Sequence, residues 1–471
     1  MRPYPILKRA AVAAALFGSF HCAPVRPLQD AEPPEATAQT FLAEKDNRFA
    51  DASVVTGWWG RFNDPQLTAL VERALAHNLD VVQAVARLDR NTALLKARGY
   101  DRYPTVTSQA GYSRERASEE LVGPVAAQDG NRFNLAANIA WELDILGRIK
   151  QRIAVAETEA AWSEADLDAV RISVAAEVGR AYMDLRGAQY RLDVAERNLA
   201  NQKESVELTQ ALSEGGRGTD LDVARAETLL RTTQASIPPI QADLARAVHR
   251  LAVLTAQPSA QLRADLGKPR ALPSLPEQVG LGDVAGLLQR RPDLRQAQQR
   301  VLQATAQYNL EATDLFPRVS VIGSLGFLSG SFSNLFTSEA FNYAIGPVVD
   351  WSFLDRHRQK AELSAADARV REQVAAYQQQ VLAALEELDN ALAAFSREEE
   401  RRRQLVLAGQ SAAKTVELAR VRFEAGIDSY LDVLDAERTL LETESSLAVS
   451  EIAAANQLIA VYYALGGAVT P

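Results

Sequence analysis

The chain of 471 residues is long enough for about two or three ordinary domains, so a single compact core is not expected. Its formal net charge of -9 argues against a nucleic-acid-binding protein, because neutralising phosphates requires a basic face. Hydrophobic residues make up 47% of the chain but aromatic residues only 7%, which is typical of long, closely packed helices. With one cysteine and no Cys/His cluster, the sequence predicts no disulfide framework, no metal site and no cofactor.

The N-terminus has the pattern of a secretory signal peptide, expected over residues 1–21. Basic residues precede an apolar stretch from Ala10 to Phe20, which is too short to span a bilayer as a helix. Cys22 follows, and in a bacterial exported protein this position predicts acylation. The alternative is an incidental cysteine, because His21 is bulky for such a site. No later stretch is apolar for long enough to span, so any membrane crossing is expected to use strands.

The chain is a tandem duplication. Residues 78–106 match residues 291–319 at an offset of 213, and residues 141–230 match residues 351–440 at an offset of 210. Recurring positions include Asp80, Arg87, Pro104, Trp141, Gly216 and Glu227, which return as Asp293, Arg300, Pro317, Trp351, Gly426 and Glu437. The predicted domains are an N-terminal extended segment 22–60, a first repeat 61–256, a linker 257–280 and a second repeat 281–466.

Each repeat contains two segments of alternating polar and apolar residues, the clearest being residues 132–143 and 341–351. Strands of about 10 residues can cross a bilayer with their apolar side chains outward. Trp141 and Trp351 would then lie at one membrane interface. The alternative is a soluble hairpin with one buried face. Since four strands cannot close and open edges in lipid are costly, strands in a membrane require several chains to share one barrel.

Long helices flank these hairpins. Heptad spacing predicts coiled-coil packing in the long helix of the first repeat. The expected helices of the first repeat cover residues 65–98, 151–213 and about 219–255, with a glycine-rich reversal at 214–218 and a kink at Pro238-Pro239. Those of the second repeat cover residues 283–313, 358–423 and 430–465, with a reversal at 424–426.

With these elements in this order, the chain resembles the TolC-like outer membrane factor family, and in particular the lipoprotein branch that serves RND-type multidrug efflux pumps. The motifs that carry the resemblance are Trp141-Glu-Leu-Asp-Ile-Leu-Gly-Arg148, Arg290-Arg-Pro-Asp293 and the segment from Phe423 to Glu437. The resemblance implies a mainly α subunit with membrane β. Three subunits would form a β-barrel of about 12 strands and a long periplasmic α-helical barrel.

The resemblance also implies the function and the partners. The protein is expected to be a lipid-anchored outer-membrane homotrimer that meets a periplasmic adaptor and an inner-membrane pump. It would be a passive duct for drugs or other small molecules, with no catalytic residues. Alternatives are a protein-secretion or metal-efflux outlet of the same fold and, in another class, a soluble periplasmic coiled-coil adaptor. An enzyme is not expected, because no nucleophile, base or metal constellation is present.

The helix-reversal turns are predicted to form a periplasmic gate. Asp428, Asp432 and Asp435 are spaced i, i+4, i+7, which predicts one helical face. In a trimer each carboxylate forms a ring, and rings of one charge select cations. By resemblance, Asp428 and Asp432 lie where family members place constriction residues. The alternative is that these are solvated acids favoured by the helix dipole.

The first repeat differs in charge at the equivalent turn. Asp222, Arg225 and Arg217 lie there, and Arg225 occupies the position of Asp435. The duplication therefore reverses the sign of the charge at this position. We predict that Arg225 or Arg217 pairs with a carboxylate of the second repeat in the closed state.

Overall fold

The computed structural model describes residues 25–34, 48–50, 57–116, 118, 120, 129–276, 278–282 and 284–467. The expected signal peptide and Cys22 lie outside the described residues. The chain forms two compact units: Met1–Glu32, Leu88–Ser163 and Ala297–Tyr377 in the first, and Pro33–Arg87, Glu164–Gln296 and Gln378–Pro471 in the second. Each unit combines pieces of both repeats, so the repeat boundaries stay predictions.

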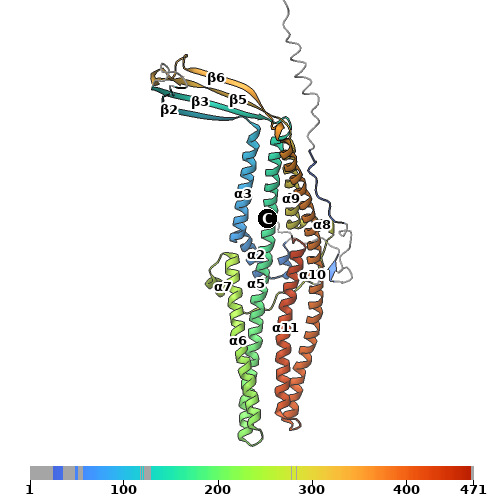
Figure 1. Cartoon of the computed structure of the whole chain (residues 1–471). Helices are drawn as coiled ribbons and strands as arrows, with labels where there is room; N and C mark the ends of the chain where they lie inside the picture. The colour runs from blue at the N-terminus through green and yellow to red at the C-terminus, as the bar shows by residue number, and fades with distance from the viewer. Residues whose placement is uncertain are drawn as a thin grey trace, which may run out of the picture. The chain divides into compact units, whose positions relative to one another are not determined.

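A four-stranded antiparallel sheet belongs to the first unit (Figure 1). Its order is β2 (Thr105–Glu115), β3 (Gly130–Leu143), β5 (Arg318–Ser329) and β6 (Phe341–Asp350). The two predicted hairpins are present, and they join through β3 and β5. β2 and β6 are the edge strands, and both are exposed along almost their whole length.

The register gives the sheet two different faces, because directly opposed residues in antiparallel strands point to the same side. On one face, Leu135 lies opposite Phe327, which lies opposite Phe341. On the other face, Asn138 lies opposite Ser324. The predicted alternation is therefore confirmed, with one largely apolar face and one polar or small-residue face.

The long helices agree with the predicted ones to within about three residues. They are α5 (Arg148–Glu214), α6 (Asp220–Thr255), α10 (Arg356–Glu424) and α11 (Tyr430–Ala464). The residues of α5 and α10 are divided between the two units. α6 includes Pro238 and Pro239 without ending there, and the kink stays a prediction.

Shorter elements complete the two units. The α-helices are α2 (Pro65–His77), α3 (Leu79–Gly99), α7 (Ser259–Leu266), α8 (Val284–Arg290) and α9 (Pro292–Thr313). The 3-10 helices are η3 (Trp58–Phe62), η4 (Tyr100–Arg102), η5 (Phe332–Asn334) and η6 (Phe353–Asp355). β1 (Phe49–Ala50) pairs in parallel with β4 (Val279–Gly280). In the core of the second unit, Trp58 stacks on Tyr462 with ring centroids 5.4 Å apart.

The opening helix of each repeat is broken, where one continuous helix was expected. α2 and α3 are separated by Asn78, whose Oδ1 accepts a hydrogen bond from the backbone N–H of Asp80 at 2.8 Å. α8 and α9 are separated by Arg291, which precedes Pro292. An asparagine cap starts α3, and a proline at its first position starts α9.

Both break residues also cap a distant helix of their own repeat. The Asn78 amide donates to the backbone carbonyl of Leu254 in the last turn of α6 at 3.0 Å. The Arg291 guanidinium donates to the carbonyl of Ala464 in the last turn of α11 at 2.8 Å. Carbonyls of a last helical turn have no partner within their helix, so each contact satisfies one such group. The two contacts occupy equivalent places in the two repeats.

One described helix, α11, is long and apolar enough to cross a membrane by length and composition, with a mean hydropathy of 1.2 over its most apolar window. The expectation that no later stretch would reach this level was therefore wrong. Half of that window is buried inside the protein, as in the core helix of a soluble protein. The helix is therefore weak evidence for a membrane span.

Candidate functional site

The first helix-reversal turn joins α5 to α6 in the second unit. The chain leaves α5 at Glu214 and turns through Gly216, whose φ of 69° is readily adopted only by glycine. α6 then starts with Thr219 as its N-cap. The Asp222 carboxylate accepts hydrogen bonds from the Thr219 backbone N–H at 3.2 Å and from its hydroxyl at 2.6 Å. Asp222 thus stabilises the start of α6 as part of a capping box.

The second turn repeats this scaffold between α10 and α11. Gly426 has a φ of 71°, and Ser429 is the N-cap of α11. The Asp432 carboxylate accepts from the Ser429 backbone N–H at 3.1 Å and from its hydroxyl at 2.9 Å. This is the arrangement in which an acid in the first turn stabilises the helix. A role for Asp432 in a gate stays a prediction.

Asp428 lies in the turn and not on α11, because the helix begins at Tyr430. The prediction that Asp428 shares a helical face with Asp432 and Asp435 is therefore wrong. Asp428 instead accepts two hydrogen bonds from Arg422, one from Nε and one from Nη2 at 2.8 Å. These bonds to Arg422 hold the pKa of the Asp428 carboxyl below its usual value.

The other predicted gate charges pair within their own repeats. Arg438 donates to Asp435 at 2.7 Å, and Arg225 lies 3.9 Å from Asp222. Among the described residues of the single chain, no hydrogen bond or ion pair joins Arg217 or Arg225 to a carboxylate of the second repeat. The predicted pairing of Arg225 or Arg217 with a carboxylate of the second repeat is therefore not seen within the single chain, and for the closed state it stays a prediction. Three or more His, Cys, Asp or Glu residues grouped to hold a metal ion are not found in the described part of the chain.

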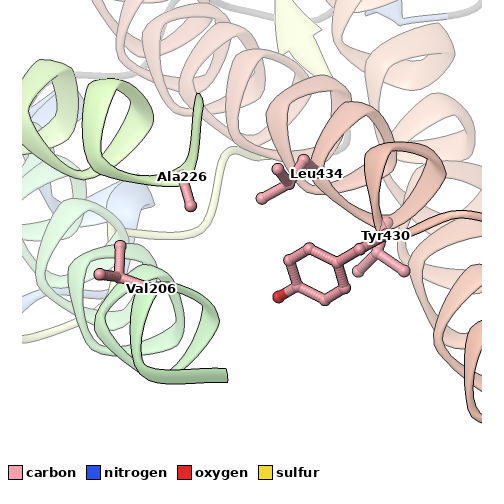
Figure 2. Packing of buried hydrophobic residues seen from close by; sticks show 5 residues of the cluster. Val206, Ala226, Tyr430 and Leu434 are labelled. Atoms are coloured by element: carbon pink, nitrogen blue, oxygen red, sulfur yellow. The ribbon is translucent and has the colours of Figure 1, made fainter. Parts of the chain in front are cut away.

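Figure 2 shows the apolar cluster that packs the two helix pairs together next to the turns. Tyr430 is 8% exposed, and its burial raises the pKa of its hydroxyl. Its ring lies against Phe423 at a centroid distance of 4.9 Å. The buried members of the cluster are Val206 of α5, Ala226 of α6, and Tyr430, Val433 and Leu434 of α11. The two helix pairs are therefore packed against each other close to the turns.

A buried carboxylate, Glu437, lies beside this cluster and was not predicted as a site residue. It is 8% exposed and accepts hydrogen bonds from Arg420 of α10 at 2.7 Å and from Ser205 of α5 at 3.1 Å. Glu437 therefore connects three helices. Its equivalent Glu227 in the first repeat is exposed and accepts a hydrogen bond from the Gln210 amide at 3.5 Å.

Of the two predicted interface tryptophans, Trp141 lies in β3, and Trp351 directly follows the last residue of β6. Trp141 is 39% exposed and donates its indole N–H to the backbone carbonyl of Arg102 at 3.0 Å. Trp351 is 54% exposed and donates to the carbonyl of Leu315 at 3.3 Å. In both cases the polar group is satisfied by protein while much of the apolar ring stays exposed. This arrangement suits a residue at a membrane interface.

Comparison with known proteins gives matches along most of the chain. A sequence model of the family described as "Outer membrane efflux protein" matches residues 70–257 and 285–467. Nodulation protein T of Rhizobium leguminosarum bv. trifolii is 28% identical over 416 residues, covering 88% of this chain and 88% of that protein. The solvent efflux pump outer membrane protein SrpC of Pseudomonas putida is 28% identical over 449 residues, covering 94% of this chain and 93% of that protein.

Among solved structures, the outer-membrane channel OprN is 37% identical with a TM-score of 0.85. The match covers 95% of this chain and 99% of that chain. The predicted fold class, long helices combined with a membrane β part, is confirmed.

Proposed function

Because the chain belongs to the outer membrane efflux protein family and is the outer-membrane channel component of an efflux system, we propose that three copies assemble into one passive duct. The family is one of channels and not of enzymes. The relative SrpC is named for solvent efflux, which supports small organic molecules as the material carried. A periplasmic adaptor and an inner-membrane pump are the partners that this role requires.

The observation that carries the proposal is the sheet with two unpaired edges. Within the part of the chain that the structure describes, β2 and β6 each have one neighbour, so each leaves backbone N–H and C=O groups without a partner in the sheet. In lipid every such group costs several kcal/mol. Antiparallel pairing of β6 of one copy with β2 of the next satisfies these groups. Three copies then close a barrel of about 12 strands, with the apolar face toward lipid and the polar face toward the lumen.

The remaining parts of the proposal follow from this assembly. Trp141 and Trp351 lie at the periplasmic interface of the membrane, and acyl chains on Cys22 anchor the mature protein to the same membrane. The helix-reversal turns form the periplasmic gate. Asp428, Asp432 and Asp435 of the second turn, with Asp222, Arg225 and Arg217 of the first, surround its opening.

Disulfide cross-linking between the edge strands tests the assembly. Thr107 of β2 and Ala344 of β6 lie on the polar face at the same level, separated by Asn138 of β3 and Ser324 of β5. Three strand spacings of about 4.8 Å separate the two edges of one copy, which is too far for a disulfide within it. Cysteine is placed at Ala344 together with each of Thr105, Thr107 and Gln109 in turn. We expect at least one pair to give covalent dimers and trimers on a non-reducing gel.

The matched control pairs Thr107→Cys with Ser324→Cys, which has the same face and level but lies on an inner strand. This pair is expected to stay monomeric. If none of the three edge pairs forms a bond between copies in membranes, the shared barrel is wrong.

A further inference from the structure

The segment between β5 and β6, residues 330–340, is an ordered loop. The loop is closed by a hydrogen bond from the backbone N–H of Leu328, near the end of β5, to the carbonyl of Ala340, the last loop residue, at 2.8 Å. Leu335, in the middle of the loop, is only 6% exposed and anchors it. The loop therefore has a defined conformation, and its remaining side chains point in defined directions.

Two large aromatic side chains of this loop are nevertheless exposed. Phe332 is 67% exposed and Phe336 is 66% exposed. Single exposed apolar side chains are common in water, but a contiguous patch of large exposed rings marks an interaction or membrane surface. The loop buries Leu335 but leaves both phenylalanine rings exposed. Its outer surface is therefore suited to an apolar or interfacial environment.

Both rings extend the apolar face of the sheet. Phe332 packs edge-on against Phe133 of β3 at a centroid distance of 5.8 Å. Phe336 packs against Phe327 of β5 at 5.6 Å. Phe133 lies opposite Ser329, so the apolar face would be interrupted by a serine at this level. Phe332 supplies the ring that β5 lacks there.

The result is an aromatic row across all four strands. Its other ring contacts are Tyr112–Phe133 at 4.9 Å, Phe327–Phe341 at 5.6 Å and Phe341–Tyr343 at 6.1 Å. Along β3, Phe133 and Trp141 are eight residues apart, or roughly 27 Å of strand. With the usual tilt of barrel strands this corresponds to an apolar band of about 20 Å. The loop lies at the end of the band away from Trp141.

We propose that residues 330–340 form a lipid-docking loop whose Phe332 and Phe336 enter the interfacial zone of the outer leaflet. This inference rests on the proposed function, in which the apolar face of the sheet contacts lipid. The loop then lies against the membrane and not across the mouth of the duct. Its polar residues, including Ser333 and Glu339, remain available to water and headgroups.

Depth-dependent fluorescence quenching tests the proposal on the full chain. Phe332→Cys and Phe336→Cys, in a Cys22→Ser background, are labelled with a small environment-sensitive fluorophore and reconstituted into phosphatidylcholine vesicles. The vesicles contain lipids with a nitroxide either near the headgroup or deep in the acyl chain. At both positions we expect the shallow nitroxide to quench about twofold more than the deep one, because aromatic belts lie at headgroup level.

Two control positions separate the failure of this inference from that of the proposed function. Ile345 lies on the apolar face of β6 and is 72% exposed, so a label at Ile345→Cys is expected to be quenched most by the deep nitroxide. A label at Ser333→Cys is expected to be quenched by aqueous iodide. If no nitroxide quenches the Ile345 label, the membrane assignment of the sheet fails.

If the Ile345 label is quenched by lipid while both loop labels respond only to iodide, the loop faces water and the proposal is overturned. The same holds if neither lipid nitroxide nor iodide reaches the loop labels, because the loop is then covered by a second copy. A second measurement uses unlabelled variants. Replacing both phenylalanines by serine is expected to reduce insertion into vesicles about tenfold relative to replacement by leucine, which keeps the apolar surface.

Discussion

The two helix-reversal turns have the same backbone and different charges. Both use a glycine with positive φ and an N-cap hydroxyl paired with an acid three residues later. In the second turn Arg422 binds Asp428, whereas the equivalent residues of the first turn are Leu212 and Gly218. The duplication has thus kept the elements that fold the turn and changed the side chains around it.

The same contrast continues into the helices. Arg420 and the buried Glu437 form an ion pair in the second repeat, whereas Gln210 and the exposed Glu227 occupy these places in the first. Beside its turn, the second helix pair is therefore joined by an ion pair, whereas the first is joined there by a hydrogen bond from Gln210 to Glu227. The ion pairs between α5 and α6, Arg191–Asp243 and Arg250–Glu177, lie farther along these helices. A substitution that breaks one of the ion pairs beside the second turn should therefore alter that turn and leave the first turn unchanged.

The largest expected effect is on Glu437. Replacing Arg420 with alanine leaves a buried carboxylate without its cation, and we expect the free energy of unfolding to fall by about 2 kcal/mol. The partial exposure of Arg420 keeps the loss below that of a fully buried pair. Thermal unfolding in detergent, followed by circular dichroism, measures it. Gln210→Ala is the matched control, with an expected change within about 0.5 kcal/mol; equal losses in both variants would contradict the contrast.

The next effect concerns the proposed gate. Asp428→Asn removes the anionic partner of Arg422 and is expected to raise single-channel conductance by about twofold, because the second turn loses the contact that holds it. Asp220→Asn neutralises an exposed acid of the first turn and should leave the conductance unchanged. Planar-bilayer recording compares the two. Unchanged conductance in Asp428→Asn, and in Asp428→Ala combined with Asp432→Ala, would remove these residues from the gate.

The dependence on pH should follow the same ion pair. Arg422 lowers the pKa of Asp428, so the stabilisation is complete above the usual pKa of aspartic acid and is lost as pH falls through the lowered value. We therefore expect the wild-type conductance to stay constant from neutral pH down to the usual aspartate range and to rise only below it. The Arg422→Ala variant should have the higher conductance at every pH, without the rise at acid pH. An acid step of the same size in Arg422→Ala would assign it to another group.

The smallest effect is expected when the charge of Arg225 is changed to that of Asp435, its equivalent in the second repeat. Arg225 lies 3.9 Å from Asp222 in an exposed pair, so Arg225→Asp should change stability by no more than about 0.5 kcal/mol. If Arg225 faces the opening, the cation-to-anion permeability ratio should increase because a positive ring becomes negative. Reversal potentials in a salt gradient measure this ratio. A constant ratio would place Arg225 away from the path of ions.

The sequence was most informative where a pattern extends over many residues. Alternation located the strands and the exposed Trp141 and Trp351, and glycines located both reversals. It was least informative where one polar side chain acts over a long distance. Asn78 and Arg291 bind the carbonyls of Leu254 and Ala464, which lie so far along the chain that no local pattern pairs them. The buried pairing of Glu437 with Ser205 depends in the same way on packing between repeats.

Those two capping contacts also bear on how the protein arose. In each repeat, the residue that begins the second part of the opening helix binds the last turn of the closing helix. The opening and closing helices of each repeat are thereby bound to each other within the same repeat. A protein with a single repeat would also need such a contact. An ancestor with one repeat would form the proposed ring from twice as many copies. After gene duplication and fusion, the two turns diverged in charge while each repeat kept its capping contact.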